Sequence, residues 1–354
     1  MLSLLTFQQE CVKAYRRYAD TVAVLSAIYY ILRKEPSIAD YLGVEVTLRT
    51  ISGNDITPDL IALCESRTNG LAFELKWSLP YSGELLTKEI KEIKKYTAPC
   101  STWKTSTGKV EYHDVILVCH VDDVERTLET LTEIAKQTDF SPLAADGFVI
   151  LSWAISATRG GERKEHLILL NAYGKNRNAT VENALKRPGG LVLPEEVLTY
   201  LRSTYSFIRQ KPPVQYTIIE LIQHVFSQFQ DPTRGPGAVY ELTTDMIYEK
   251  SKILFPSWED YDVQTIQAKR SWISEALEVM WSLKIVGKPV GKPDSWLVPI
   301  PTLRTREPIQ SALCKKLARY QLKIGKKPIR RGRPRTKPLK LQAHPRTKRI
   351  DDYF

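Results

Sequence analysis

Two apolar stretches, Thr57–Cys64 and Leu71–Trp77, flank a turn that ends in Asn-Gly. The second stretch alternates apolar side chains with small or charged ones, which is the pattern of a β-strand. Asn-Gly between two such stretches is typical of a β-hairpin. Folding a hairpin brings the start of its first strand beside the end of its second strand. We therefore expect Asp59 to lie next to Glu74 and Lys76 at one end of a sheet.

These three charged side chains would make a chemically useful group. Two carboxylates and a backbone carbonyl, here that of Leu75, form an oxygen-only site of the kind that suits Mg²⁺ or Mn²⁺. A metal bound there can polarise a phosphate and acidify a water molecule, and a lysine beside it can offset charge that builds on the phosphate. The charges lie within apolar strands, where a charge without a role is costly to place. The alternative for Asp59, Glu74 and Lys76 is a cross-strand salt bridge at a sheet end.

Pro58-Asp59, fourteen intervening residues and Glu74-Leu75-Lys76 resemble the signature of the PD-(D/E)XK nuclease superfamily. That family includes restriction endonucleases, junction resolvases and repair exonucleases. The resemblance implies that Asp59 and Glu74 hold Mg²⁺ or Mn²⁺, that Lys76 positions the attacking water, and that phosphodiesters are hydrolysed. Related nucleases often carry a further acidic ligand on an N-terminal helix. Glu10 is the candidate for that ligand, and a solvated glutamate on a helix face is the alternative.

Around the hairpin, the periodicity of apolar residues predicts an α/β domain over residues 1–175. The expected elements, in order, are helices at Leu5–Tyr18 and Asp20–Arg33, a strand at Gly43–Thr50, the hairpin, a helix at Gly83–Thr97, a strand at Asp114–Val121, a helix at Asp122–Gln137, and strands at Gly147–Ile155 and His166–Ala172. This order suits a mixed central sheet and agrees with the restriction-endonuclease-like core that the resemblance implies. We expect Gly43–Thr50 to be the edge strand beside the hairpin.

The helix expected at Gly83–Thr97 is amphipathic. Glu92 and Tyr96 lie on one face because they are four residues apart. They resemble the Gln-x-x-x-Tyr motif of the RecB-like nucleases, with Glu in place of Gln. Lysines gather on another side and are candidates for contact with a nucleic-acid backbone, a solvated helix face being the alternative. These lysines are Lys88, Lys91 and Lys95.

A second domain is expected after a polar linker and a helix at residues 176–212. Over residues 213–303, helices followed by a β-hairpin with a basic tip resemble a winged helix-turn-helix, which usually docks its last helix on DNA. Lys269 and Arg270 lie on that last helix and are candidates for DNA contact. Such domains also serve as protein–protein modules, and that alternative stays open.

The basic charge of the chain is concentrated in residues 304–354. The formal net charge is +11, and this segment has 17 Lys/Arg against 3 acids, or +14, which leaves 34 against 37, or −3, for the first 303 residues. A basic tail on a near-neutral body indicates a polyanionic partner. Most of the tail is expected to be disordered when free, with a possible helix at Pro308–Leu322. Within it, Arg331, Gly332, Arg333 and Pro334 resemble an AT-hook, which binds a narrow minor groove. General phosphate attraction or a localisation signal would need the same charges.

The last residues differ from the rest of the tail. Ile350, Tyr353 and Phe354 place one aliphatic and two aromatic side chains at the C-terminus. This pattern is similar to the peptides by which replication and repair enzymes bind a sliding clamp, although Thr347 stands where such peptides usually have glutamine. The alternative is an incidental apolar terminus.

The cysteines and the apolar runs suggest where the chain works. Its five cysteines are scattered without a Cys-x-x-Cys pair, which suggests a reducing compartment and no zinc site. No signal peptide or membrane-spanning run is visible. We expect the cytoplasm or nucleoid, or the nucleus in a eukaryote.

Together these features predict a Mg²⁺-dependent DNA endonuclease of repair, recombination or restriction. Many members of the superfamily act as dimers, so a homodimer is possible. The main alternative is a non-catalytic DNA-binding or regulatory protein that uses the nuclease fold as a scaffold. RNA as the substrate is disfavoured only by the winged-helix and AT-hook resemblances.

Overall fold

The computed structural model describes residues 4–34, 39, 41–44, 46–64, 69–80, 82–100, 104–105, 108–110, 112–157, 165–185, 191–194, 197, 211–231, 233, 238–255, 263–292, 294–299 and 309–325. The chain divides into two compact units. Residues 20–209 form the sheet unit, and residues 1–19 with 210–354 form the helical unit. Each unit is described by itself below.

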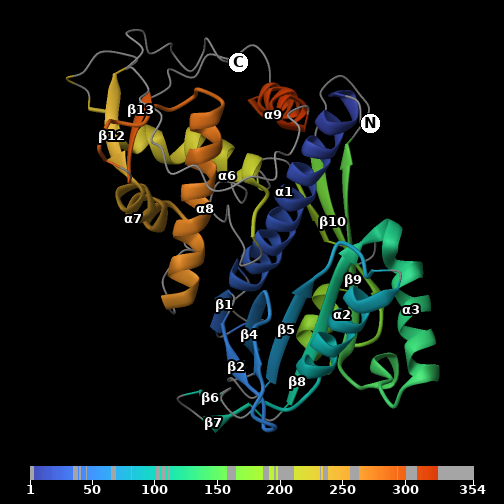
Figure 1. Cartoon of the computed structure of the whole chain (residues 1–354). Coiled ribbons are helices and arrows are strands. Elements are labelled where there is room, and N and C mark those ends of the chain that lie inside the picture. Colours follow the sequence, from blue (N-terminus) through green and yellow to red (C-terminus); the bar gives the residue numbers. More distant parts are fainter. Residues whose placement is uncertain are drawn as a thin grey trace. The chain divides into compact units, whose positions relative to one another are not determined.

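The sheet unit is built on a seven-stranded mixed sheet (Figure 1). Its strands lie in the spatial order β1 (Tyr41–Val44), β4 (Leu60–Cys64), β5 (Asn69–Leu75), β8 (Tyr112–His120), β9 (Phe148–Ala157), β10 (Glu165–Tyr173) and β11 (Leu191–Leu193). β5 is parallel to β8, and β8 is parallel to β9. The other neighbours are antiparallel. The sequence-based expectation of an α/β fold with a mixed sheet is confirmed.

Two helices connect the parallel strands and cover one face of the sheet (Figure 1). α2 (Gly83–Tyr96) links β5 to β8, and α3 (Val124–Gln137) links β8 to β9 after the short turn η1 (Val121–Asp123). Parallel strands need such crossovers because their ends lie far apart. Alternate residues of the strands and one side of each helix form a single apolar core, which includes Ile61, Ala72, Ile93, Leu117 and Leu131.

The hairpin of β4 and β5 has the register that brings the two strand ends together. Leu60 pairs with Phe73 and Ile61 with Ala72, so the residue before β4 lies beside the last residues of β5. All residues of both strands are buried. Smaller pairs flank the sheet, namely β2 (Leu48–Arg49) with β3 (Asp55–Ile56), and β6 (Lys104–Thr105) with β7 (Gly108–Lys109).

Several local predictions for the first half of the chain are corrected. The two expected N-terminal helices are one helix, α1 (Leu4–Lys34), because no breaker interrupts the helical sequence between Tyr18 and Asp20. The edge strand beside the hairpin is β1, whereas Leu48–Arg49 turns away to pair with β3. The polar segment expected to be a linker contains a short helix, α4 (Ala179–Leu185), and then β11. A further short turn, η2 (Pro142–Ala144), precedes β9.

The helical unit has the element order helix, strand, helix, helix, strand and helix. Its elements are α6 (Val214–Glu220) with its continuations η3 (Leu221–Val225) and η4 (Phe226–Phe229), β12 (Val239–Thr243), α7 (Thr244–Leu254), α8 (Val263–Ser282), β13 (Ser295–Pro299) and α9 (Ile309–Gly325). β12 pairs antiparallel with β13, and Gly287 makes a further bridge to Leu297. The sequence reasoning placed no strand at β12. The possible helix in the tail is confirmed as α9.

Cys11 of α1 and Cys314 of α9 form a disulfide within the helical unit. The scattered spacing of the cysteines gave no sign of it, because 303 residues separate the two positions. Cys64, Cys100 and Cys119 are buried and take part in no disulfide among the described residues. Gln310 also links α9 to α1, because its amide donates to the Tyr15 hydroxyl at 3.1 Å.

Three sequence-based predictions fall outside the described residues. They are the helix expected at Glu195–Arg209 apart from Val197, the AT-hook-like core, and the clamp-like terminus. Among the helices that the structure describes, none combines the length and the apolar character needed to span a bilayer.

Candidate active site

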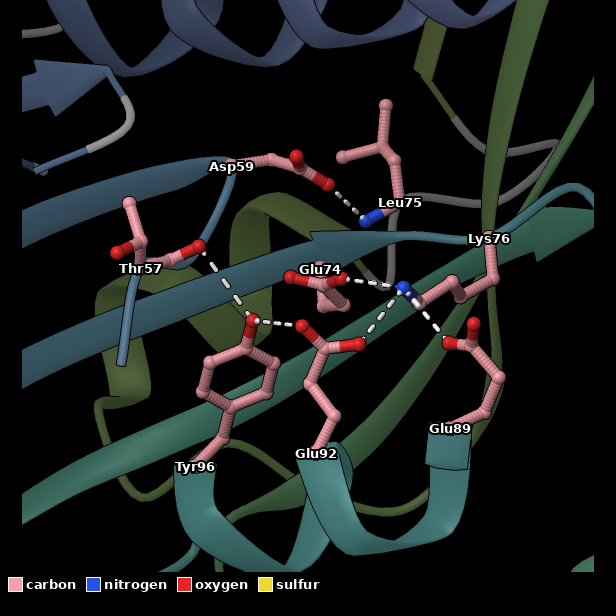
Figure 2. Close-up of polar contacts among 8 residues, drawn as sticks. All are labelled: Thr57, Asp59, Glu74, Leu75, Lys76, Glu89, Glu92 and Tyr96. Carbon is pink, nitrogen blue, oxygen red and sulfur yellow. Dashed lines mark hydrogen bonds and ion pairs between the residues drawn. The ribbon is translucent and has the colours of Figure 1, made fainter. Parts of the chain in front are cut away.

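The hairpin register places Asp59 against the end of β5. The Leu75 backbone N–H donates to Asp59 Oδ2 at 2.7 Å, which fixes the carboxylate beside the residues that follow. Glu74 and Lys76 flank Leu75 on the face that α2 covers (Figure 2). The structure thus brings Asp59, Glu74 and Lys76 together, as the hairpin predicts.

Lys76 lies at the centre of a group of carboxylates (Figure 2). Its ammonium Nζ lies 2.7 Å from Glu74, 2.8 Å from Glu89 and 3.3 Å from Glu92. Glu74 comes from β5, and the other two glutamates come from α2. We call Asp59, Glu74, Lys76, Glu89 and Glu92 the acid cluster.

Tyr96 joins α2 to the segment before β4. Its hydroxyl lies 3.3 Å from Glu92 Oε1 and donates to the Thr57 carbonyl at 3.4 Å. The side chain is buried, with 2% of its surface exposed. The spacing of Glu92 and Tyr96 predicts their shared face. Glu89 was missed, although a helix also places it on that side, three residues before Glu92.

Backbone pairing beyond the end of β5 holds Lys76 in place. Its N–H donates to the Val118 carbonyl at 2.9 Å, and the His120 N–H donates to the Trp77 carbonyl at 3.2 Å. The His120 ring stacks on Trp77 with centroids 4.8 Å apart, and Trp153 packs edge-on against both rings. His120 is therefore a packed residue at the end of the sheet.

The acid cluster has more negative than positive charge, and this shifts the protonation of its members. Burial, followed by the nearby Asp59 carboxylate, raises the pKa of Glu74 to about 8, although Lys76 opposes the shift. Burial alone would lower the pKa of Lys76, but the attraction of Glu74 and of the α2 glutamates outweighs it and raises that pKa. Burial and the charges of Glu74 and Glu92 raise the pKa of Tyr96.

One carboxylate oxygen of the acid cluster is suited to bind a cation. Glu74 is 5% exposed, and its Oε2 atom is buried without a hydrogen-bond partner among the described residues. A buried carboxylate oxygen without a partner is costly, and a divalent cation bound by Asp59 and Glu74 would compensate it. Within the described part of the chain, no group of three or more His, Cys, Asp or Glu residues is already arranged for a metal ion. The Lys76 ammonium lies among the carboxylates instead.

The remaining predicted site residues lie elsewhere. Glu10 is exposed on the part of α1 that belongs to the helical unit. Lys88, Lys91 and Lys95 are exposed on α2. α8 turns the Lys269 side chain into the protein, where the residue is 2% exposed. Lys269 is therefore not available at the surface for contact with DNA.

Arg270 is available at the surface but is already engaged. Its Nε atom lies 3.2 Å from Asp245 Oδ1, and its guanidinium lies 5.0 Å from the Tyr248 ring centroid. The lysines expected at the tip of the second hairpin are also paired, Lys288 with Glu278 at 2.9 Å and Lys292 with Glu241 at 2.7 Å.

No family model, curated protein or solved structure matches this chain.

Proposed function

We propose that this chain is a metal-dependent DNA endonuclease that hydrolyses phosphodiester bonds at the acid cluster. The observation that carries the proposal is the buried Glu74 carboxylate, whose Oε2 atom has no partner among the described residues. It lies beside Asp59 and Lys76, the two other residues of the predicted signature. A cross-strand salt bridge would need only one acid, whereas Lys76 contacts three glutamates.

The order of elements around the acid cluster supports the proposal. Apart from the small pairs β2–β3 and β6–β7, the elements α1, β1, β4, β5, α2 and β8 follow one another as helix, three antiparallel strands, helix and parallel strand. This is the order that the PD-(D/E)XK resemblance implies. Asp59 immediately precedes β4 and Glu74 lies on β5, at the end where β5 leads into the crossover to α2.

Each residue would have a distinct part in the reaction. Asp59, Glu74 and the Leu75 carbonyl would hold Mg²⁺ or Mn²⁺, which when bound polarises a phosphate and supplies an acidified water. Lys76 would orient the attacking water and offset charge on the phosphate oxygens. Glu89 and Glu92 hold the Lys76 ammonium at the site, and Tyr96 holds Glu92. These three are positioning residues.

Binding of DNA would involve further parts of the chain. The order of α6, β12, α7, α8, the bridge at Gly287 and β13 supports a winged-helix-like domain, which would dock on DNA or on a protein. The basic tail, with Arg331, Gly332, Arg333 and Pro334, would add phosphate and minor-groove contacts. A sliding clamp that binds Ile350, Tyr353 and Phe354, and a homodimer, stay predictions from the sequence.

The test is nuclease activity on labelled linear, flapped, forked and four-way-junction DNAs with Mg²⁺, Mn²⁺ or EDTA. We expect cleavage with metal, none with EDTA, and a loss of about 10²–10³-fold in rate for Lys76→Ala. Lys136→Ala, which changes an exposed lysine on α3, is the control and should cut normally. DNA binding without cleavage of any substrate would favour the non-catalytic alternative. Calorimetry would then show whether Mn²⁺ binds and whether Asp59→Ala abolishes that binding.

A further inference from the structure

A pocket of about 710 Å³ lies in the sheet unit between α2 and the segment that leads into β4. Its α2 wall carries Lys88, Lys91 and Lys95. The opposite wall is formed by Asp55 to Thr57. The volume falls within the range of about 300–1,000 Å³ that is usual for sites that bind small molecules.

The lysines of the α2 wall differ from the other cations described around the acid cluster. Lys76 is surrounded by acids and Lys136 pairs with Glu133. By contrast, Lys88, Lys91 and Lys95 are exposed and have no ion-pair partner among the described residues. Glu84 and Glu92 line the same wall, but in the described structure neither pairs with these three lysines, and a row of unpaired ammonium groups favours a ligand with several negative charges.

The spacing of these lysines fits the backbone of one nucleic-acid strand. Seven residues of α-helix separate Lys88 from Lys95, a length of about 10 Å at 1.5 Å per residue. One strand of B-DNA has a phosphate about every 3.4 Å along the helix axis, and an unpaired strand can be more extended, so the row spans at most about three nucleotides.

The pocket also opens onto the acid cluster. Glu92 and Tyr96 line it, and the same Glu92 carboxylate contacts the Lys76 ammonium. Figure 2 shows Glu92 and Tyr96 side by side on α2, facing Lys76 and Thr57. A strand that follows the lysine row therefore leads to the residues proposed to hydrolyse it.

The pocket suits one strand and not a duplex. Cations line only the α2 wall, and the opposite wall presents the exposed carboxylate of Asp55. Asp55 pairs with Arg49 at 3.8 Å, and among its lining residues this wall offers no cation for the phosphates of a second strand.

We propose that the α2 pocket binds an unpaired segment of DNA by its backbone and presents it to the acid cluster. The substrate would then be a DNA that carries a single-stranded end or branch. This inference rests on the proposed nuclease function for its meaning, but its binding step does not require cleavage.

The binding step is tested by acetylation of lysines in the full chain, read residue by residue by mass spectrometry, in EDTA. The probes are a short oligothymidylate and a blunt duplex of the same length. At about ten times its dissociation constant, the oligothymidylate should slow acetylation of Lys88, Lys91 and Lys95 about tenfold, since only free protein reacts. Lys136 and Lys175, exposed lysines of the same unit, are the internal controls and should change less than about twofold.

Equal reactivity of the three α2 lysines with and without oligothymidylate, or equal protection of the two controls, would overturn the proposal. Stronger protection by the blunt duplex would also overturn it. Because the readout is local, DNA held by the basic tail does not imitate the expected result.

Cleavage separates this inference from the proposed function. In the full chain, Lys91→Glu should slow cutting of a flapped DNA by about tenfold or more through weaker binding, whereas Lys136→Glu should not. If wild-type protein cuts and Lys91→Glu cuts equally well, the pocket proposal fails and the nuclease proposal stands. If the oligothymidylate protects the α2 lysines but nothing is cut, the nuclease proposal fails and the pocket stands.

Discussion

Two buried ionic groups lie on the neighbouring strands β5 and β8, toward opposite ends, and they differ in charge balance. Toward the start of β8, the fully buried Asp114 carboxylate accepts hydrogen bonds from Arg177 N at 2.8 Å and from Arg177 Nε at 2.6 Å. The guanidinium also donates to the His113 carbonyl and lies 4.5 Å from the Tyr112 ring centroid. One acid therefore meets one base, and the hydrogen-bonding groups are used within the protein.

The acid cluster at the end of β5 has the opposite character. Several carboxylates share Lys76, and Glu74 Oε2 is buried without a partner among the described residues. Burial raises the pKa of Asp114 as well, but there the hydrogen bonds of Arg177 offset part of the shift. In the Asp114–Arg177 pair the two charges compensate each other within the protein. The acid cluster instead has an excess of negative charge, which a bound cation would compensate. The comparison teaches that burial alone does not mark a functional charge.

The largest expected effect on stability is at the balanced pair. Arg177→Ala would leave the Asp114 carboxylate buried without its guanidinium, which should lower the free energy of unfolding by about 3–5 kcal/mol. Urea denaturation followed by circular dichroism measures it. Lys175→Ala, an exposed neighbour, is the control and should change little. A loss below about 1 kcal/mol for Arg177→Ala would show that this pair is not what stabilises the fold.

A substitution in the acid cluster should have the opposite effect: it should reduce the rate of cleavage without lowering the free energy of unfolding. Glu74→Gln removes a proposed metal ligand and should reduce cleavage by about 10²–10³-fold. Above a pH of about 8, where Glu74 is ionised, the variant's free energy of unfolding in EDTA should not fall, because the excess negative charge is reduced. Steady-state cleavage assays and urea denaturation of the same preparation measure the two effects. An unfolded or strongly destabilised Glu74→Gln would instead indicate a structural salt bridge.

A glycine gives a smaller, separate test of the balanced pair. Gly147 has φ +78°, and a Cβ atom there would collide with Asp114 Oδ1 and approach Arg177 Nε to 2.7 Å. Gly147→Ala should therefore lower the free energy of unfolding by about 1–3 kcal/mol. Gly53 also has a positive φ but open space around its Cα, so Gly53→Ala is the control for conformational strain without collision. Equal losses in the free energy of unfolding at Gly147 and Gly53 would show that the close approach of Asp114 and Arg177 to Gly147 does not contribute.

The smallest expected effect is the stabilisation of the folded protein by bound Mn²⁺, which should differ between variants of the two ionic groups. Mn²⁺ at about ten times its dissociation constant should raise the free energy of unfolding of the wild type by about 1.4 kcal/mol. Glu74→Gln should lose this increment, whereas Arg177→Ala should keep it, because its acid cluster is intact. Thermal unfolding with Mn²⁺ and with EDTA measures the difference. An increment that Glu74→Gln retains would place the metal elsewhere.

The sequence by itself determined the local part of this site. The alternation of β4 and β5 and the Asn-Gly turn are enough to bring Asp59 beside Glu74 and Lys76, because a hairpin relates residues close in the chain and its side chains alternate with period two. Helical spacing likewise places Glu92 and Tyr96 on one side of α2. The mixed sheet follows from the order of the elements for the same local reasons.

Tertiary structure alone decided the rest. Glu89 enters the acid cluster only because α2 crosses back over β5, and Lys269 faces the core only because of how α8 packs. Asp114 meets Arg177 across 63 residues, and Cys11 meets Cys314 across 303. Such partners depend on how distant segments pack, which side-chain periodicity within one segment does not encode.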